Sequence, residues 1–454
     1  MRTFDVVVVG AGPGGEVAAG RLAEAGLSVA IVEADKVGGE CSYYACMPSK
    51  ALLRPGELLA EVRRVPGVAE AVTGGLDRDA VLRRRDELIG GLDDVGQLPW
   101  LTDRGITLVR GRGRLTGEKQ IEVAGETLRA RRAVILAAGT TATLPDIDGL
   151  AESKPWTNRE ATTAKQIPES LVVVGGGVVG VEMSQAYASL GARVTLIDGS
   201  RGLLPREEDF AREQVTAALV EAGVEIRRGR RATAVRRDGD RVHVTLDDGG
   251  PVTAEEVLVA AGRTPQTAGL GLDGVGVAAE GFVKVDDRMR VPGLDWLYVV
   301  GDLNGRALFT HMAKYQAAIA ATAVLGGDMT AEHLADGPGS PRVIFTDPQL
   351  AAVGHTSASA AAAGLPVRII DVPTDGNAGA SFTGGDRGTA RFLVDERRDV
   401  LVGVTVVGTA VAEFLQAATI AIVGEVPVGR LRHAIPPFPT RSEIWLALFN
   451  ALGI

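Results

Sequence analysis

The chain has 454 residues, enough for about three domains that each bury a core. Its formal net charge of −9 weighs against a nucleic-acid partner, and its two cysteines exclude a framework of structural disulfides. The N-terminus lacks the apolar core of a signal peptide, and no apolar run approaches the roughly 18 residues of a membrane span. We therefore expect a soluble, cytoplasmic protein without a membrane partner.

The first predicted elements are a strand, a glycine-rich turn and a helix. The run from Val6 to Val9 is continuously β-branched, as expected of a parallel strand buried on both faces, and a helical pattern spans Glu16 to Ala25. The turn between them has the dinucleotide-binding fingerprint. Its glycines allow a tight turn, the approach of a pyrophosphate to the helix N-terminus, and close packing of helix on strand. They are Gly10, Gly12 and Gly15.

A second strand, from Ser28 to Val32, leads to Glu33, whose carboxylate would accept hydrogen bonds from a ribose. A charged helical stretch is expected further on, from Asp79 to Leu92. Its run of three arginines, Arg83 to Arg85, is most simply a solvated helix face, although an arginine there could meet an anionic cofactor.

Cys41 and Cys46 follow the first nucleotide motif closely. A close pair in such a chain is more often catalytic or metal-binding than structural. Residues five apart on a regular helix lie roughly 8 to 9 Å apart at Cα, whereas a disulfide needs about 4.4 to 6.8 Å. A bridge therefore requires a loop or a distorted first turn, with Cys46 near a helix N-terminus that favours a thiolate. The alternatives are two inert buried cysteines or a zinc site, and the five histidines are too scattered to complete the latter.

The succession of strand, glycines, helix, strand and acid then recurs. In both copies the acid follows the second glycine by 21 positions, which makes two nucleotide sites far more probable than two structural turns. The second copy consists of a strand from Leu171 to Val174, Gly175, Gly177 and Gly180, a helix ending near Gly191, a strand from Arg193 to Ile197, and Asp198.

Each copy closes with a strand that runs into a small-residue turn, at Gly139 and at Gly262, where a nucleotide can approach the backbone. One more buried strand, from Leu297 to Val300, delivers Asp302 toward a helix that begins near Thr310. Asp302 is thus well placed for a ligand hydroxyl, with a simple helix cap as the alternative.

The character of the chain changes from about Pro338, where strands and helices alternate without a nucleotide fingerprint. We expect an α+β domain that serves assembly. Its predicted strands run from Val343 to Phe345, from Thr389 to Val394 and from Leu401 to Val407, with helices near 355–363 and 411–424.

Together these features resemble the FAD-dependent pyridine nucleotide–disulfide oxidoreductases, which include dihydrolipoamide dehydrogenase, glutathione reductase, mycothione reductase and mercuric reductase. The resemblance runs from Val6 to about Trp445. It implies an α/β fold with two Rossmann-like dinucleotide-binding domains, for FAD and NAD(P), and an α+β C-terminal dimerisation domain of a homodimer. The implied domains are 1–150 with 266–337 for FAD, 151–265 for NAD(P), and 338–454 for the dimer interface.

The resemblance also implies roles for residues. Lys50 and Glu182 match a pair beside the flavin, Cys46 matches the cysteine against the ring, and Cys41 matches the outward thiol that attacks an acceptor. The positions that match FAD contacts are Gly10, Gly12, Gly15, Glu33, Lys50, Gly113, Gly139, Asp302, Thr310 and His311. Those that match NAD(P) contacts are Gly175, Gly177, Gly180, Asp198 and Gly262.

The chain departs from the family at its C-terminal motif. In the disulfide reductases a histidine of the partner subunit, within His-Pro-x-x-x-Glu, manages the proton of the outward thiol. Phe438 stands in its place, and His433 lies five residues too early. Glu443 is kept, for a direct acid–base role, a salt bridge with a residue such as Arg441, or a structural role. Because acid–base help is typically worth about 10² to 10⁴ in rate, an ordinary disulfide reductase would lose much.

Two further features bear on the substrates. Tyr43 and Tyr44 between the cysteines, together with Phe438, favour a flat or aromatic acceptor, although ordinary packing explains the tyrosines equally well. Mercury reduction is disfavoured because no cysteine follows Cys46. Asp198 should bind the 2′-hydroxyl of NADH, whereas Arg201 could favour the 2′-phosphate of NADPH; we favour NADH.

We predict an FAD flavoenzyme that oxidises NAD(P)H and passes electrons through a Cys41–Cys46 redox disulfide to an unidentified small-molecule acceptor. Two alternatives stay open. One is a diaphorase-type quinone reductase in which the cysteines are secondary, and the other is a non-catalytic flavoprotein that serves as a redox sensor.

Overall fold

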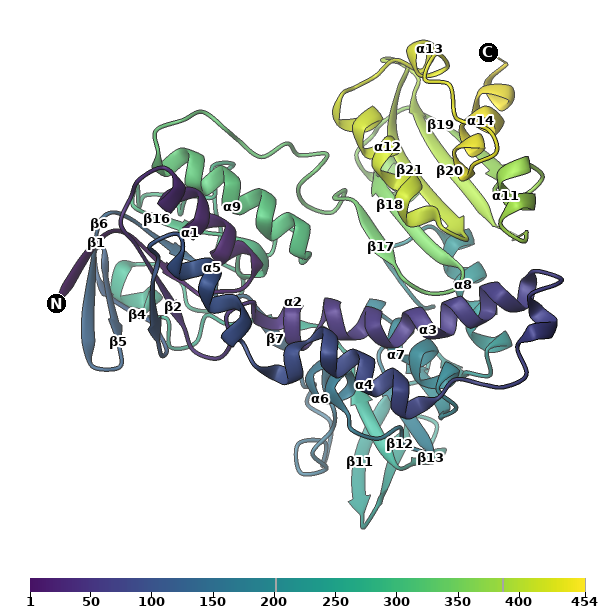
Figure 1. The fold of residues 1–454 in the computed structure, drawn as a ribbon, viewed down its shortest axis with the longest axis horizontal. Helices are drawn as coiled ribbons and strands as arrows, with labels where there is room; N and C mark the ends of the chain where they lie inside the picture. The colour runs from purple at the N-terminus through teal and green to yellow at the C-terminus, as the bar shows by residue number, and fades with distance from the viewer. Residues whose placement is uncertain (201, 386–387, 454) are drawn as a thin grey trace. The chain divides into compact units, whose positions relative to one another are not determined.

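A computed structural model describes residues 1–200, 202–385 and 388–453 of the chain (Figure 1). These residues form two compact units, each built from three separate stretches of sequence. The first unit comprises Met1–Pro48, Asp86–Ala142 and Arg263–Gly337, and the second comprises Ser49–Arg85, Thr143–Gly262 and Pro338–Ile454. The helices α3 (Cys46–Arg64) and α4 (Arg78–Leu88) each include a boundary between the units.

A largely parallel sheet forms the centre of the first unit. β1 (Arg2–Val9) lies between β2 (Val29–Glu33) and β6 (Glu126–Leu136), and pairs with both in parallel. Val6, Val7 and Val8 have no exposed surface, as predicted for a strand covered on both faces. The sheet order is β3-β2-β1-β6-β5-β4, with β16 also paired to β6. Its other strands are β3 (Thr107–Arg110), β4 (Arg114–Gly117), β5 (Gln120–Val123) and β16 (Leu297–Val299).

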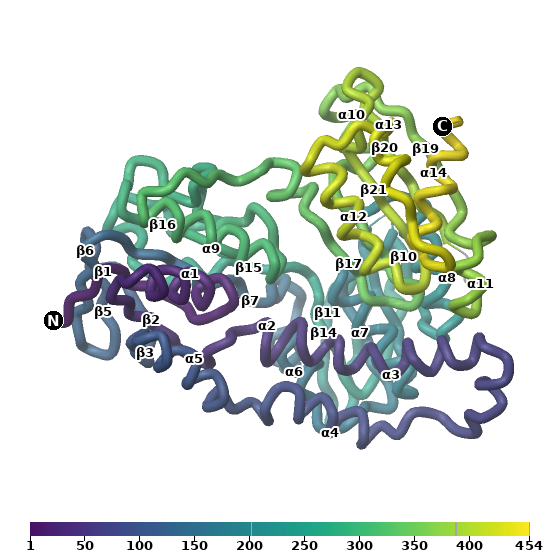
Figure 2. The backbone as a smooth tube through the Cα atoms, turned by 45° about the horizontal axis from the view of Figure 1, so that its top comes forward, coloured from purple at the N-terminus to yellow at the C-terminus, as the bar shows by residue number. Residues whose placement is uncertain are grey.

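Two helices pack side by side in the first unit, α1 (Pro13–Glu24) and α9 (Thr310–Val324), as Figures 1 and 2 both show. Val6 and Val8 share a core with residues of these helices, while Val7 and Val9 belong to a second core. α1 begins three residues before the predicted helix because Pro13, with its fixed φ, suits a first helical position. The unit also holds α2 (Gly39–Tyr43), α5 (Leu98–Thr102), β7 (Thr140–Ala142), β15 (Arg263–Pro265) and η5 (Gly301–Asn304).

The second unit repeats this arrangement. Its parallel sheet has the order β10-β9-β8-β14, which matches β3-β2-β1-β6 strand for strand and confirms the predicted duplication. A three-stranded antiparallel sheet, β11-β12-β13, stands between β10 and β14 in the chain. The elements are α6 (Asn158–Thr163), β8 (Ser170–Val174), α7 (Val178–Ser189), β9 (Arg193–Asp198), α8 (Asp209–Glu221), β10 (Glu225–Arg228), β11 (Ala232–Asp238), β12 (Arg241–Leu246), β13 (Pro251–Ala254) and β14 (Glu256–Val259).

The C-terminal part of the second unit is an antiparallel sheet of five strands with the order β17-β18-β21-β20-β19. α12 packs on β18 and β21, and buried residues of this sheet share a core with α7 and α8. The three predicted strands are present, whereas β18 and β19 were not predicted from the sequence. The elements are β17 (Arg342–Ile344), β18 (Gln349–Gly354), α10 (Ser357–Ala362), β19 (Val367–Pro373), α11 (Ala378–Phe382), β20 (Thr389–Asp395), β21 (Val400–Gly408), α12 (Val411–Val423), α13 (Val428–Leu431) and α14 (Ile444–Leu452).

Arg85 corrects one expectation from the sequence. The run Arg83 to Arg85 was expected to form a solvated helix face, but Arg85 has no exposed surface. Its guanidinium donates hydrogen bonds to the backbone carbonyls of Thr162 and Ala164. Arg85 lies one helical turn after the buried Val81, so the inward face of α4 includes this cation. Arg83 on the same helix is exposed, as predicted.

We predict that Arg85→Met destabilises the protein by about 2 to 4 kcal/mol, because one buried and one partly buried carbonyl lose a charged donor. Arg83→Met, the matched control on the exposed side of α4, should change stability by less than about 0.5 kcal/mol. Urea denaturation followed by circular dichroism measures both. Equal midpoints for the two variants would show that the buried hydrogen bonds contribute nothing.

Candidate active site

The first glycine turn excludes side chains at two positions and opens to solvent at a third. Gly10 has a φ of 104°, and a Cβ there would lie 2.4 Å from the carbonyl oxygen of Ala137. A Cβ on Gly15 would lie 1.8 Å from the oxygen of Gly10. At Gly12, in contrast, a Cβ would meet no atom of the described chain within 4 Å. The first amides of α1 therefore adjoin open space, where a pyrophosphate could accept their hydrogen bonds.

The second turn has the same geometry. A Cβ on Gly175 would lie 2.4 Å from the oxygen of Ala260, and one on Gly180 would lie 1.9 Å from the oxygen of Gly175. A Cβ on Gly177 would again meet nothing within 4 Å among the residues that the structure describes. Both predicted nucleotide turns thus fit a dinucleotide, each in its own unit.

The two predicted ribose acids end equivalent strands. Glu33 ends β2, and its carboxylate accepts hydrogen bonds from the amides of Ala11, at 2.6 Å, and Asp35, at 2.7 Å. Burial is the main cause that raises the pKa of Glu33. Asp198 ends β9, is 7% exposed, and accepts a hydrogen bond from the hydroxyl of Ser200. Arg201, the competing phosphate ligand, lies outside the described residues.

Asp302 belongs to a network that the sequence did not reveal. The Thr140 hydroxyl donates to its carboxylate at 2.7 Å, and Arg263 Nε donates to Thr140 Oγ1 at 2.9 Å. Burial raises the pKa of Asp302. The N-cap of α9 is Phe309, so the alternative of Asp302 as a cap of that helix is wrong. The carboxylate is held in the first unit, where it can still accept a ligand hydroxyl.

The remaining predicted cofactor positions differ in accessibility. Gly139 follows β6 with a φ of 71°, and a Cβ there would meet no described atom within 4 Å. At Gly262, with a φ of 131°, a Cβ would make only ordinary contact with Thr143, whose Oγ1 would lie 3.7 Å away. Gly113 is enclosed, because a Cβ there would lie 3.0 Å from Val9 Cγ1. His311, in the first turn of α9, is exposed and stacks on Phe309 with ring centroids 5.4 Å apart.

The cysteines lie on two separate helices. Cys41 belongs to α2, which ends at Tyr43, and Cys46 begins α3. The backbone at Tyr44, with φ −134° and ψ −1°, leaves the helical path, which is the distortion that a bridge requires. No disulfide joins the two cysteines in the described structure, and a hydrogen bond with Cys46, followed by burial, raises the pKa of Cys41. Thr310 Oγ1 lies 3.4 Å from Cys46 Sγ, so the first turn of α9 adjoins the pair.

Tyr43 packs in the interior. It is 3% exposed, and burial raises its pKa to about 12. Its ring lies 6.3 Å from that of Tyr44, which is half-buried. Ordinary packing therefore accounts for Tyr43, and only Tyr44 retains surface that a ligand could contact.

Lys50 and Glu182 form the predicted ion pair in the second unit. Lys50 Nζ lies 2.7 Å from Glu182 Oε2, and Glu182 is 3% exposed. The other carboxylate oxygen accepts a hydrogen bond from the amide of Phe345 at 2.9 Å, and Lys50 Nζ lies 4.9 Å from the centre of that ring. Since a buried carboxylate needs both charge and hydrogen-bond compensation, the pair holds the Lys50 ammonium in a defined position.

The residues of the C-terminal motif differ in exposure and in their contacts. Phe438 is 76% exposed, and His433 is exposed as well. Glu443 is 8% exposed, and its carboxylate accepts a hydrogen bond from the amide of Gly379, in the first turn of α11, at 2.7 Å. This contact favours the structural role among the three that the sequence left open for Glu443.

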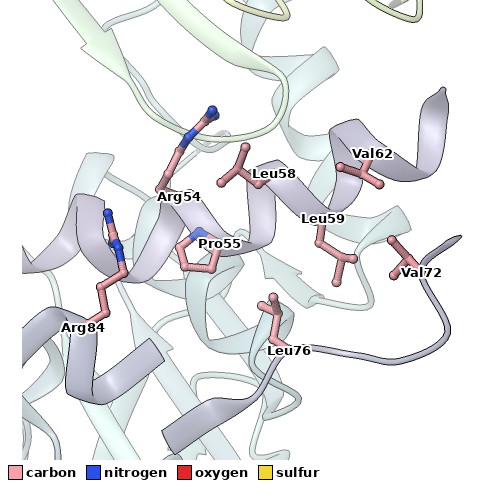
Figure 3. Close-up of a pocket in the computed structure, with 8 residues that line it drawn as sticks. All are labelled: Arg54, Pro55, Leu58, Leu59, Val62, Val72, Leu76 and Arg84. Carbon is pink, nitrogen blue, oxygen red and sulfur yellow. The ribbon is translucent and has the colours of Figure 1, made fainter. Parts of the chain in front are cut away.

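An open apolar pocket of about 390 Å³ lies in the second unit between α3 and the segment that leads into α4 (Figure 3). Leu58, Leu59, Val62 and Leu76 supply apolar surface, and Arg54 and Arg84 stand on one side of it. None of the predicted site residues lines it.

Comparison with known proteins identifies the fold and the chemistry. The family described as pyridine nucleotide-disulphide oxidoreductase matches residues 4–322, and its dimerisation domain matches residues 340–448. The chain belongs to the pyridine nucleotide-disulphide oxidoreductase family. The family assignment confirms the predicted α/β fold with FAD and NAD(P) domains and a dimerisation domain, which in turn supports a homodimer.

Relatives extend over the whole chain. A dihydrolipoyl dehydrogenase of Thermus scotoductus is 33% identical and covers 100% of this chain and 98% of its own length. A mercuric reductase of Bacillus cereus is 30% identical over 97% of this chain and 70% of its own length. The crystal structure of LpdA from Mycobacterium tuberculosis aligns with a TM-score of 0.87 and 27% identity, covering 98% of this chain and 99% of LpdA. The flavoprotein disulfide reductase RclA from Escherichia coli shares the fold, with a TM-score of 0.86 at 23% identity, and covers 97% of this chain and 98% of its own.

As a member of the pyridine nucleotide-disulphide oxidoreductases, the protein is an NAD(P)H-dependent FAD flavoenzyme. No helix within the described ranges is long and apolar enough to cross a membrane. Across the same ranges, no cluster of three or more His, Cys, Asp or Glu side chains could hold a metal ion.

Proposed function

We propose that Cys41 and Cys46 form a redox-active disulfide that carries electrons from NADH to a small-molecule acceptor. The observation that supports this most strongly is the contact of the two thiols at the break between α2 and α3, beside Thr310. When bound, FAD supplies the two-electron chemistry that connects a nicotinamide to a disulfide. In the first unit Gly12, Glu33 and Asp302 would hold it.

Cys46 and Cys41 take different parts in this proposal. The N-terminus of α3 and the hydroxyl of Thr310 stabilise a thiolate on Cys46. Because the hydrogen bond with Cys46 raises the pKa of Cys41, the proton of the reduced pair stays on Cys41. Cys41 must lose this proton before it attacks an acceptor, so attack becomes faster as the pH rises.

With a disulfide as acceptor, thiol–disulfide exchange needs no oxidant or reductant besides the reduced cysteine pair. The Cys41 sulfur bonds to one acceptor sulfur, and the other acceptor sulfur leaves as a thiolate and takes up a proton. The Cys46 thiolate then attacks the Cys41 sulfur, restores the Cys41–Cys46 disulfide, and releases the second acceptor sulfur as a thiolate, which takes up a proton from solvent. The Lys50 ammonium, fixed by Glu182, supplies the positive charge that the family position of these residues implies.

A second candidate is diaphorase-type reduction of quinones, in which the cysteines are secondary. Phe438 favours it, because a phenyl ring that is 76% exposed stands where the family has a proton-handling histidine. A quinone needs only electrons and solvent protons. A non-catalytic redox sensor is disfavoured by the two open nucleotide turns and by the intact Lys50–Glu182 pair.

Cys41→Ser separates the two candidates. In the holoenzyme with NADH, the variant should lose at least about 100-fold in kcat/KM toward dithionitrobenzoate, an aromatic disulfide, because its nucleophile is gone. Reduction of menadione, a quinone, should change by less than about threefold, since it bypasses the thiol. Full disulfide reductase activity in Cys41→Ser would overturn the redox role of the pair.

We propose NADH as the preferred reductant. Asp198 is buried at the end of β9, and its carboxylate would bind a 2′-hydroxyl and repel a 2′-phosphate. The open turn at Gly177, in the same unit, would bind the pyrophosphate of the same dinucleotide.

Asp198→Ala should lower the ratio of kcat/KM for NADH to that for NADPH by about tenfold, equivalent to about 1.4 kcal/mol. Asp240→Ala, which removes an exposed aspartate between β11 and β12, serves as the control and should leave the ratio unchanged. A wild-type preference for NADPH of about tenfold would contradict the proposal.

A further inference from the structure

The segment 203–208 follows the second ribose acid and packs on the second glycine turn. The amide of Leu204 donates a hydrogen bond to the carbonyl oxygen of Gly176 at 2.8 Å. A Cβ on Gly176 would lie 2.6 Å from Leu203 Cδ2 and 2.7 Å from Cγ of Asp198, the acid that ends β9. The segment, the turn and the acid are therefore in direct contact.

The hydrogen bond from Leu204 orients the next amide of the turn. In a trans peptide, the carbonyl oxygen and the following amide hydrogen point in opposite directions. Because Leu204 binds the oxygen of Gly176, the N–H of Gly177 points away from the segment. Gly177 is the N-cap of α7, and a Cβ there would meet no atom of the described chain within 4 Å. The segment thus holds a donor toward the space where the pyrophosphate of a dinucleotide would lie.

Packing against the C-terminal sheet supports the backbone of this segment. Leu204 has a φ of 53°, a conformation that residues with side chains rarely adopt. Leu203 and Leu204 are almost fully buried, and they belong to a core that includes Ile344 and Leu350 of the five-stranded sheet. The sheet therefore helps to keep the segment in a conformation that is unfavourable by itself.

Glu207 forms a buried ion pair with Arg342 of β17. The guanidinium of Arg342 donates two hydrogen bonds, from Nε to Glu207 Oε1 at 2.7 Å and from Nη2 to Glu207 Oε2 at 2.8 Å. The exposed fraction of the side chain is 5% for Glu207 and 10% for Arg342. Such a paired contact fixes the orientation of its partners as well as their distance. Arg342 belongs to the dimerisation domain, residues 340–448, so this domain holds one end of the segment.

Glu208 makes a second connection to the same domain. It is the N-cap of α8, which lies against the five-stranded sheet (Figure 1). Its carboxylate accepts hydrogen bonds from the amide and the hydroxyl of Ser357, each at 2.6 Å, and from Arg391 Nη1 at 3.0 Å. Arg391 in turn donates two hydrogen bonds to Asp371, both at 2.7 Å. Both acids at the end of the segment are thus bound by the dimerisation domain.

We propose that two arginines of the dimerisation domain, Arg342 and Arg391, position the binding site of the dinucleotide reductant. They act through Glu207 and Glu208, and are therefore positioning residues. With its end fixed, segment 203–208 keeps its hydrogen bond to the glycine turn, and the turn keeps its amide directed toward the pyrophosphate. The inference rests on the function proposed above, in which this turn binds NADH.

Binding of ADP-ribose to the oxidised holoenzyme, measured by isothermal titration calorimetry, tests the proposal. ADP-ribose has the pyrophosphate and the adenosine ribose of NADH but cannot reduce the flavin. Arg342→Met should weaken its binding by about tenfold, because a hydrogen bond to the pyrophosphate is misdirected. Arg342→Lys, which keeps the charge without the paired geometry, should weaken it by about threefold. Arg368→Met removes an exposed arginine of β19 and, as the matched control, should bind like the wild type.

Steady-state kinetics distinguishes positioning from a general loss of structure. In Arg342→Met, the KM for NADH should rise by about tenfold, because the variant changes the binding of the reductant. The rate of menadione reduction at saturating NADH should change by less than about twofold. A fall in this rate with an unchanged KM would contradict the proposal.

A second variant controls for stability, because Arg342→Met leaves the buried Glu207 carboxylate without its charged partner. Glu207→Leu/Arg342→Met replaces the pair by apolar side chains, a change that is often neutral for stability. This double variant should retain FAD and unfold near the urea midpoint of the wild type. It should still bind ADP-ribose about tenfold more weakly, because an apolar contact does not fix one orientation. Wild-type affinity in Arg342→Met or in the double variant would overturn the proposal.

A different result would overturn the choice of NADH without affecting the role of Arg342. If the wild type binds 2′-phospho-ADP-ribose about tenfold more tightly than ADP-ribose, the proposed reductant is wrong. The affinity of Arg342→Met for 2′-phospho-ADP-ribose would then decide whether the dimerisation domain positions the site, with the same tenfold loss expected.

Discussion

The contact between Cys41 and Cys46 depends on the break between α2 and α3. A continuous helix would hold the two α-carbons roughly 8 to 9 Å apart, too far for a disulfide. In the protein, Tyr44 leaves the helical path, and Cys46 starts a new helix whose N-terminus and neighbour Thr310 both favour a thiolate. The same contact raises the pKa of Cys41, which makes removal of its proton a required step before attack on an acceptor.

The duplicated nucleotide folds provide the electron supply, and both of them could be predicted from the sequence. Strand, glycine turn, helix and acid recur at equal offsets because the close approach of each helix to its turn requires glycine: a Cβ at Gly15 would lie 1.8 Å from the oxygen of Gly10, and one at Gly180 would lie 1.9 Å from the oxygen of Gly175. Such constraints are local, so they can be read from spacing alone. The Lys50–Glu182 pair was predictable only through the family resemblance, since the two residues are far apart in the chain.

The features that could not be predicted from the sequence depend on packing between residues that are far apart in the chain. Arg85 stands in a run of charges that is typical of a solvated face, yet it is buried against carbonyls of α6 and the segment that follows it. In the Arg263–Thr140–Asp302 network, Thr140 lies more than a hundred positions from each of its two partners, and nothing local marks it as a partner. Likewise, Glu443 matches a catalytic motif by position, but its carboxylate binds the Gly379 amide of α11. Motif position predicts where such groups lie better than what they contact.

The most direct test of the central claim is an anaerobic titration of the holoenzyme with NADH, with the absorbance of the bound flavin as the readout. If Cys41 and Cys46 form a redox-active disulfide, the wild type should take up two equivalents of NADH per FAD, one for the disulfide and one for the flavin. Cys41→Ser should take up one. Uptake of a single equivalent by the oxidised wild type, equal to that of the variant, would contradict the account.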